Sequence, residues 1–167
     1  MARKTEKTSK TNAMRELEAA GIAFVTQTYE VDEGVPQRDL GIRIAEQLGA
    51  DPDSQFKTLV TTTPSGGHVV CCVPVAEELD LKKAAAAAEE KSLSMMHVRD
   101  LERVCGYVRG ACSPVGMRKP FPTIIDETAV LFERIGVSGG RKGVCLSMSP
   151  EDLVAFTHAT LADIVVS

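Results

Sequence analysis

The sequence contains no tryptophan, and aromatic residues make up only 4% of its 167 residues. It has no apolar run that approaches the ~20 residues of a transmembrane helix. Residues 1–10 are basic and polar and lack the apolar segment of a secretory signal peptide, so they predict a disordered tail. Residues 11–167 are long enough to bury the core of one domain, and a single domain is the expectation.

Metal-binding and disulfide patterns are also missing. The five cysteines form no C-x-x-C motif, and the three histidines lack the spacing of metal ligands. We therefore predict no metal site and no disulfide framework, and a reducing cytoplasm is the expected compartment. Cys112 and Cys145 are candidate nucleophiles, but no histidine base lies near either in the sequence, so buried small hydrophobic residues are the preferred interpretation.

Several common catalytic motifs do not occur. The sequence has no G-x-S-x-G, P-loop or G-x-G-x-x-G pattern, which removes support for an ordinary serine hydrolase, a nucleotide hydrolase or a dinucleotide enzyme. The formal net charge of −4 argues against a general nucleic-acid-binding protein. A local basic patch stays compatible with that charge.

Two glycine-rich loops, residues 110–114 and 138–140, are each followed by a basic pair, Arg118-Lys119 and Arg141-Lys142. Backbone amides in such loops can approach a phosphate or an ester carbonyl closely. Tight turns between strands are the alternative explanation of the glycines, and a solvated surface is the alternative for the charges. A phosphate-bearing ligand would account for both features together.

Short apolar and β-branched runs, separated by turn residues, predict strands at residues 22–29, 55–63, 68–75, 92–95, 123–126, 130–137, 144–148 and 163–166. Capping residues and helical spacing predict helices that begin after Thr11, Asp80 and Ser149, at His97, and with Pro36 in a first turn. These elements favour a mixed α/β fold: a mostly antiparallel, barrel-like sheet that closes on itself, with short helices around it.

One residue of the strand at 55–63 does not fit a plain core strand. Lys57 stands between Phe56 and Thr58, and a lysine ammonium held against apolar neighbours must be paired or functional. Because side chains alternate along a strand, simple exposure of Lys57 to water is the alternative.

A series of short blocks carries a resemblance: residues 29–30, 56–59 (Phe-Lys-Thr-Leu), 74–75, 79–83, 106–107, 110–116, 122–126 and 137–143. In this order and spacing they resemble the YbaK/EbsC family of aminoacyl-tRNA deacylases, from about Ala13 to the C-terminus, and most of all its members that act on Cys-tRNA(Pro) and Cys-tRNA(Cys). The resemblance implies the editing-domain fold associated with prolyl-tRNA synthetase, a mixed α/β structure around a barrel-like sheet.

The resemblance also implies an activity: hydrolysis of a mischarged aminoacyl ester, without metal, cofactor or covalent enzyme intermediate. Lys57 matches the family's essential lysine. The implied substrate-binding residues are Tyr29, Phe56, Thr58, Gly110, Pro114, Ser138, Gly139, Gly140 and Cys145. Charge alone adds Arg118, Lys119, Arg141 and Lys142 as candidates for contact with tRNA phosphates.

The implied substrate is the acceptor end of an aminoacyl-tRNA, prolyl-tRNA synthetase is a candidate protein partner, and no membrane is involved. In the resembling enzymes the cysteinyl thiol attacks its own carbonyl and leaves as a thiolactone. Cys145 departs from the family pattern, because an aspartate is common at this place, and this puts the rate and the aminoacyl specificity in question. Two alternatives stay open: a non-catalytic module that binds aminoacyl-tRNA or a synthetase, and a deacylase for Ala- or Ser-tRNA.

Overall fold

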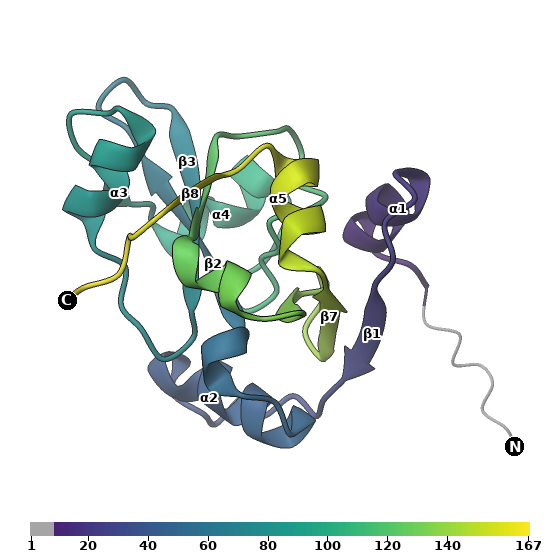
Figure 1. Cartoon of the computed structure of the whole chain (residues 1–167). Coiled ribbons are helices and arrows are strands. Elements are labelled where there is room, and N and C mark those ends of the chain that lie inside the picture. Colours follow the sequence, from purple (N-terminus) through teal and green to yellow (C-terminus); the bar gives the residue numbers. More distant parts are fainter. Residues whose placement is uncertain (1–8) are drawn as a thin grey trace, which may run out of the picture.

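Two β-sheets form the centre of the molecule in the computed structural model, which describes residues 9–167 (Figure 1). One sheet has the order β1-β7-β6, formed by β1 (Val25–Thr28), β7 (Val144–Met148) and β6 (Ile135–Ser138). The other has the order β4-β2-β3-β5-β8, formed by β4 (Ser94–Met95), β2 (Phe56–Thr62), β3 (His68–Pro74), β5 (Thr123–Asp126) and β8 (Thr160–Ala162). Most of the tail expected at residues 1–10 lies outside the described residues.

The pairing confirms a mixed α/β fold with mostly antiparallel strands. Of the six strand pairs in residues 9–167, four are antiparallel, while β3–β5 and β5–β8 are parallel. The expected closure of one sheet on itself is wrong. The two sheets meet at an isolated parallel bridge between Gln55 and Gly136, and no strand ladder joins β2 to β6 beyond it in residues 9–167. The loop after α4 lies at the end of β6 instead, where Ser138 Oγ donates to the Ala111 carbonyl at 2.8 Å.

The helices begin where the capping residues predict. Thr11, Asp80 and Ser149 are the N-caps of α1 (Asn12–Ala19), α3 (Leu81–Ala88) and α5 (Pro150–Thr157), and each side chain accepts a hydrogen bond from a backbone N–H of the first turn. Pro36 and His97 precede α2 (Gln37–Leu48) and α4 (Val98–Cys105). No helix in the described part of the chain combines the length and the apolar character that a membrane crossing needs.

Two strand predictions are wrong, and Asp126 explains both. Its Oδ2 accepts hydrogen bonds from the backbone and the hydroxyl of Thr128, which turns the chain into the 3-10 helix η3 (Glu127–Leu131), so β6 begins only at Ile135. Its Oδ1 accepts from the Ile164 N–H at 3.0 Å, so this amide is not available to a strand ladder. The last strand is therefore β8 at 160–162, not residues 163–166, where Val165 forms an isolated bridge with Leu79.

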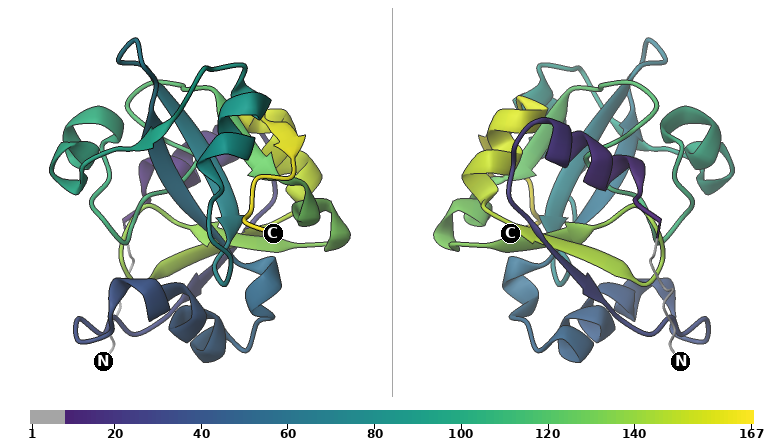
Figure 2. Two further views of the ribbon diagram at one scale, coloured as in Figure 1. Left: turned by 90° about the vertical axis from the view of Figure 1, so that its left-hand side faces the viewer. Right: turned by 90° about the vertical axis from the view of Figure 1, so that its right-hand side faces the viewer.

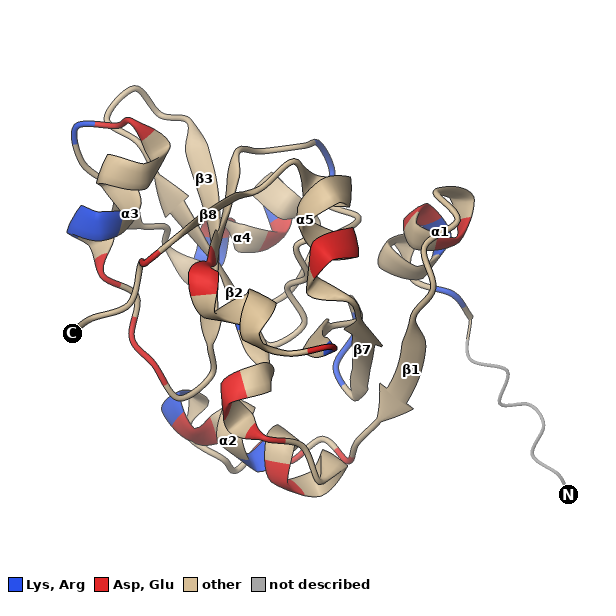
Figure 3. Cartoon of the chain, viewed as in Figure 1, with Lys and Arg blue, Asp and Glu red and all other residues tan. Residues whose placement is uncertain are grey.

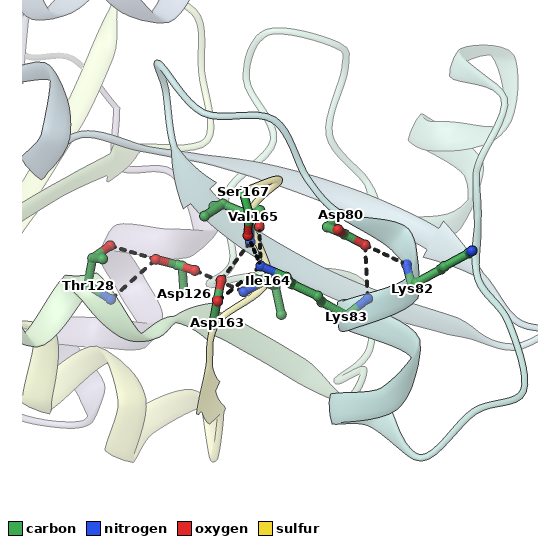
Figure 4. Close-up of polar contacts among 9 residues, drawn as sticks. All are labelled: Asp80, Lys82, Lys83, Asp126, Thr128, Asp163, Ile164, Val165 and Ser167. Atoms are coloured by element: carbon green, nitrogen blue, oxygen red, sulfur yellow. Dashed lines mark hydrogen bonds and ion pairs between the residues drawn. The ribbon is translucent and has the colours of Figure 1, made fainter.

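Lys83 fixes the C-terminal segment against α3. Its ammonium donates to Asp163 Oδ2 at 3.0 Å, to the Val165 carbonyl at 2.8 Å and to Ser167 Oγ at 2.9 Å (Figure 4). These contacts join residues 80 to 84 positions apart in the sequence and hold the end of the chain beside the five-stranded sheet.

The helices cover the sheets from different sides. α1 and α5 pack with β6 and β7 in one apolar cluster, and α3 packs with β3 and β5 in a second cluster. α2 lies apart from α1 and α5, across one end of the sheets (Figures 1 and 2). Gly41 allows α2 to approach closely, because a Cβ there would lie 2.5 Å from the Cβ of Val75. This packing leaves a space between α2, β2 and the loop after α4.

Candidate functional site

A cavity of about 450 Å³ occupies that space. This volume falls in the range of ~300–1,000 Å³ that is typical of sites for small organic ligands. Its walls come from β2, α2, β6, β7, the segment from β4 to α4, and the loop at Arg109–Cys112. Segments that are far apart in the sequence therefore meet at one hollow.

The pairing of β2 determines where the cavity opens. β2 pairs with β3 along its whole length, but on its other edge, within residues 9–167, it meets β6 only through the Gln55–Gly136 bridge and β4 only at Thr61 and Thr62. Residues 57–59 lie between these contacts and are half-buried, whereas residues 54–56 and 60–61 on either side are buried. The cavity lies along this uncovered edge.

Lys57 is part of the cavity wall and is half-buried. Burial lowers the pKa of its ammonium, while the carboxylates of Glu78 and Glu77 act in the opposite direction. No ion pair in the described part of the chain includes Lys57. The site thus holds a partly desolvated cation that can interact with an electron-rich group of a ligand.

The structure brings most of the residues expected at the site to this cavity. Those on its wall, besides Lys57, are Tyr29, Phe56, Thr58, Gly110, Ser138 and Cys145. Pro114 and Gly139 do not line it: Pro114 is buried, and Gly139 packs against Val144. Gly140 lies on a second hollow, described below.

Ser138 connects the two glycine loops. Its hydroxyl donates to the Ala111 carbonyl at 2.8 Å and accepts from the Gly140 N–H at 3.1 Å. Gly110 has a φ of +88°, a left-handed backbone conformation that residues other than glycine rarely adopt. The two loops are thus adjacent in space, and the first of them places backbone at the cavity.

Neither candidate cysteine nucleophile has the properties of a reactive thiolate. Burial raises the pKa of Cys145 to about 11, and its Sγ lies 3.7 Å from Gln55 Oε1, to which the thiol donates. The pKa of Cys112 is also raised, chiefly through its hydrogen bond with Cys105 and by burial. Both side chains are buried, in agreement with the interpretation as small hydrophobic residues. They stay protonated at neutral pH.

The sequence reasoning missed several cavity residues. Gln55 is 9% exposed and touches Cys145, and its place beside Gly136 follows from a contact between distant strands that no local pattern signals. Arg38 and Arg109 are exposed residues on the cavity wall. Arg109 directly precedes Gly110 of the predicted glycine loop, and this position in the sequence could have marked it as a cavity residue. The remaining apolar wall includes Met95, Met96 and Leu101.

A second hollow, of about 520 Å³, lies on the other side of the Gly106–Cys112 loop. Arg141 and Lys142 line it, and Lys142 Cε would be 3.5 Å from a Cβ at Gly110, so this lysine lies between the hollow and the cavity. Arg118 packs against Gly106, which also lines the hollow. Lys119 instead lies over the ring of Phe121, 5.6 Å from its centroid.

Neighbouring groups already hold three of these cations. Arg141 donates to the Ser9 carbonyl, Arg118 donates to the Glu102 carbonyl, and Lys142 is 3.6 Å from Glu33. Figure 3 shows the basic and acidic residues interspersed along the described part of the chain. No group of three or more His, Cys, Asp or Glu side chains within residues 9–167 is placed to hold a metal ion.

Comparisons with known proteins show which family the chain resembles in sequence and in fold. Residues 36–156 match the model of the aminoacyl-tRNA editing domain. A curated relative from Enterococcus faecalis, named "Putative Cys-tRNA(Pro)/Cys-tRNA(Cys) deacylase EbsC", is 39% identical over 155 residues, which cover 93% of each chain.

Two solved structures share the fold. One, described as a "putative trans-editing enzyme for prolyl tRNA synthetase", has a TM-score of 0.78 at 23% identity and covers 96% of this chain and 100% of that one. The "hypothetical protein APE2540" has a TM-score of 0.81 at 21% identity and covers 93% of this chain and 99% of the other. With the family model matched over most of its length, the chain belongs to the aminoacyl-tRNA editing domain family.

Proposed function

We propose that the chain is an aminoacyl-tRNA deacylase that cleaves the ester of Cys-tRNA(Pro) or Cys-tRNA(Cys). The name of the Enterococcus relative and the family match support this activity. The observation that carries it is the placement of Lys57, a half-buried cation on a cavity whose wall also contains Gly110 and Ser138. The compartment that suits this activity is the cytoplasm, where tRNAs are charged.

Lys57 and the loop backbone would act on the ester carbonyl. A cation and N–H groups held in a partly water-excluded cavity stabilise the negative charge that develops on the carbonyl oxygen during attack. An aminoacyl ester is already activated, so orientation and charge stabilisation supply much of the required rate. The roles of Tyr29 and Phe56 on this view are to shape the pocket around the aminoacyl group.

The substrate itself would supply the nucleophile. A cysteinyl thiol with a pKa near ~8.5 is partly ionised at neutral pH, and its sulfur can attack the carbonyl carbon of its own ester. A sulfur–carbon bond then forms, the carbon–oxygen ester bond breaks, and the 3′ oxygen of the tRNA leaves with a proton. The product is a thiolactone, which water later opens. This route needs no protein thiolate, in keeping with the raised pKa values of Cys112 and Cys145.

The acceptor end of the tRNA would reach the cavity past the second hollow. Arg141 and Lys142 line that hollow, Arg118 borders it, and Lys119 is the next residue in the chain. Phosphate oxygens could replace the carbonyl and carboxylate groups that these side chains contact now. Prolyl-tRNA synthetase is a candidate partner that would deliver the mischarged tRNA.

The test is a panel of substrates with identification of the product. We expect rapid release of cysteine from Cys-tRNA(Pro), trapped first as a thiolactone, and much slower deacylation of Ser-tRNA and Ala-tRNA, which lack the thiol. Comparable rates on all three would contradict the thiol-assisted route and point to an enzyme-positioned water. Tight binding of all three without turnover would instead show a non-catalytic binding module.

A further inference from the structure

The backbone of β2 presents one residue to the cavity with its hydrogen-bonding groups free of any strand partner. In a strand the N–H and C=O of one residue point to the same edge, and the next residue points to the opposite edge. The Gln55 carbonyl accepts from the Val75 N–H at 2.8 Å, on the β3 side. Alternation therefore directs the backbone groups of Lys57 and Leu59 toward β3, and those of Phe56, Thr58 and Val60 away from it.

Two of these three outward residues already have neighbours. Phe56 follows the bridge between Gln55 and Gly136, and the Val60 carbonyl accepts from the Met96 N–H at 3.2 Å. Thr58 falls between them, in the half-buried stretch that borders the cavity. No strand pairs with β2 at Thr58 on this edge in the described part of the chain.

The side chain of Thr58 is directed elsewhere. Its Oγ1 lies 3.8 Å from the Sγ of Cys72, the residue opposite it in the β2–β3 ladder. The polar groups that Thr58 offers at the open edge are therefore its backbone N–H and C=O. Together they can form the two hydrogen bonds of one residue in an adjacent antiparallel strand.

An α-aminoacyl ester carries the complementary pair of groups, a carbonyl oxygen that accepts and an α-ammonium that donates. We propose that the aminoacyl group binds as a one-residue extension of the sheet, in which the Thr58 N–H donates to the ester carbonyl oxygen and the Thr58 C=O accepts from the α-ammonium. This inference rests on the proposed deacylase function. It makes the Thr58 N–H a second donor, besides Lys57, that stabilises the developing charge.

The geometry also sets the class of ligand. Because the edges on both sides of Thr58 are occupied, the open segment accommodates a single aminoacyl unit and excludes a longer peptide strand. The contacts use only groups common to all α-amino acids. Thr58 therefore recognises the aminoacyl ester as such, and the rest of the cavity wall selects the side chain.

The first experiment removes the amide hydrogen of Thr58. Replacement of Thr58 by its α-hydroxy acid analogue turns the preceding amide into an ester and keeps the side chain. Because the ester also makes the Lys57 carbonyl, which faces β3, a weaker acceptor, urea denaturation first checks that the variant is folded. The single-turnover rate on Cys-tRNA(Pro) should fall about 100-fold, the size expected for the loss of one oxyanion donor. Thr58→Val keeps the N–H and loses the hydroxyl, so it should lose clearly less rate than the ester variant, and an equal loss in the two variants would overturn the proposal. A wild-type rate for the ester variant would overturn the proposal.

A second measurement does not depend on turnover. Titration of the chain with 3′-cysteinylamino-3′-deoxyadenosine, a non-hydrolysable amide, should shift the Thr58 amide proton downfield in ¹H–¹⁵N spectra and leave the Leu59 amide nearly unchanged. The same compound without its α-amino group should bind at least tenfold more weakly. Binding that leaves Thr58 unshifted, or no binding, would overturn the proposal, whereas a shifted Thr58 in a chain without deacylase activity would contradict the proposed function alone.

Discussion

The carboxamide of Gln55 lies against the backbone of Gly136, at the point where the two sheets join. The Gln55 Nε2 donates to Ser54 Oγ at 3.2 Å, and its Oε1 accepts from Cys145 Sγ. A Cβ at residue 136 would overlap the carboxamide. The absence of a side chain at Gly136 therefore lets one buried polar group connect β2, β6 and β7 beside the cavity.

Gly136→Ala should disrupt this junction. Because the added methyl must displace Gln55, we expect the free energy of unfolding to fall by about 1–3 kcal/mol, the cost of overpacking a filled site. Urea denaturation measures it. Gly34→Ala is the matched control, since its nearest neighbour would be the Asp32 carboxylate at 3.4 Å in an exposed loop, and it should leave stability unchanged. Equal midpoints for both variants would contradict the packing described.

Lys57→Met tests the desolvation of Lys57 through the pH dependence of stability. The lowered pKa in the folded state means that the unfolded chain binds more protons between that pKa and the ordinary value of 10.5. The wild type should therefore gain stability as pH rises through this window. The variant lacks the group and should melt at or above the wild-type temperature at pH 7, with an advantage that shrinks toward pH 10.5. Exposed Lys91→Met should show no such trend.

Cys145→Asp introduces the residue that resembling proteins commonly carry at this place. A carboxyl group at a site only 4% exposed, beside the Gln55 oxygen, is held in its neutral form by burial, and it should lower the free energy of unfolding by about 1–3 kcal/mol. It should also alter the rate or the amino-acid preference of deacylation. Cys71→Ser changes a buried thiol in the other apolar cluster, away from the cavity, and should leave both kinetic properties alone. Small and equal kinetic effects of the two would make Cys145 a packing residue.

Salt dependence tests the second hollow. Each phosphate contact to single-stranded RNA contributes about −0.7 to the slope of log affinity against log salt. The double change Arg141→Gln and Lys142→Gln should therefore make the slope for tRNA less steep by about 1.4. Lys82→Gln, at an exposed position of α3, should leave the slope unchanged. An unaltered slope in the double variant would place the tRNA elsewhere on the surface.

Local signals in the sequence predict much of this fold. Thr11, Asp80 and Ser149 each cap a helix because the signal and the structure lie within one turn. The sequence pattern gave the wrong strand where a residue far away in the chain determines the hydrogen bonding. Asp126 accepts from the Ile164 N–H, 38 residues away, and the last strand therefore ends before residue 163. The apolar run at 130–137 gave no sign of the 3-10 turn that Asp126 starts.

In the candidate site, too, local motifs can be predicted from the sequence, whereas contacts between distant residues cannot. The Phe56-Lys57-Thr58 block and the Gly110 loop can be recognised as motifs, and the structure places both at one cavity. The wall of that cavity also includes Gln55 and Cys145, which are in contact although they lie 90 positions apart in the sequence, and no local pattern signals such a contact. Arg38 reaches the cavity only through the packing of α2, which follows from the tertiary structure.

The most direct test of the account is the single-turnover deacylation of Cys-tRNA(Pro) by the wild type, by Lys57→Ala and by Lys91→Ala. If the cavity beside β2 is where the ester is cleaved, Lys57→Ala should lose about 100- to 1,000-fold in rate, as expected for the loss of a charge-stabilising group, and should remain folded. Lys91→Ala, an exposed lysine elsewhere, should match the wild type. Wild-type activity in a folded Lys57→Ala variant would contradict the account.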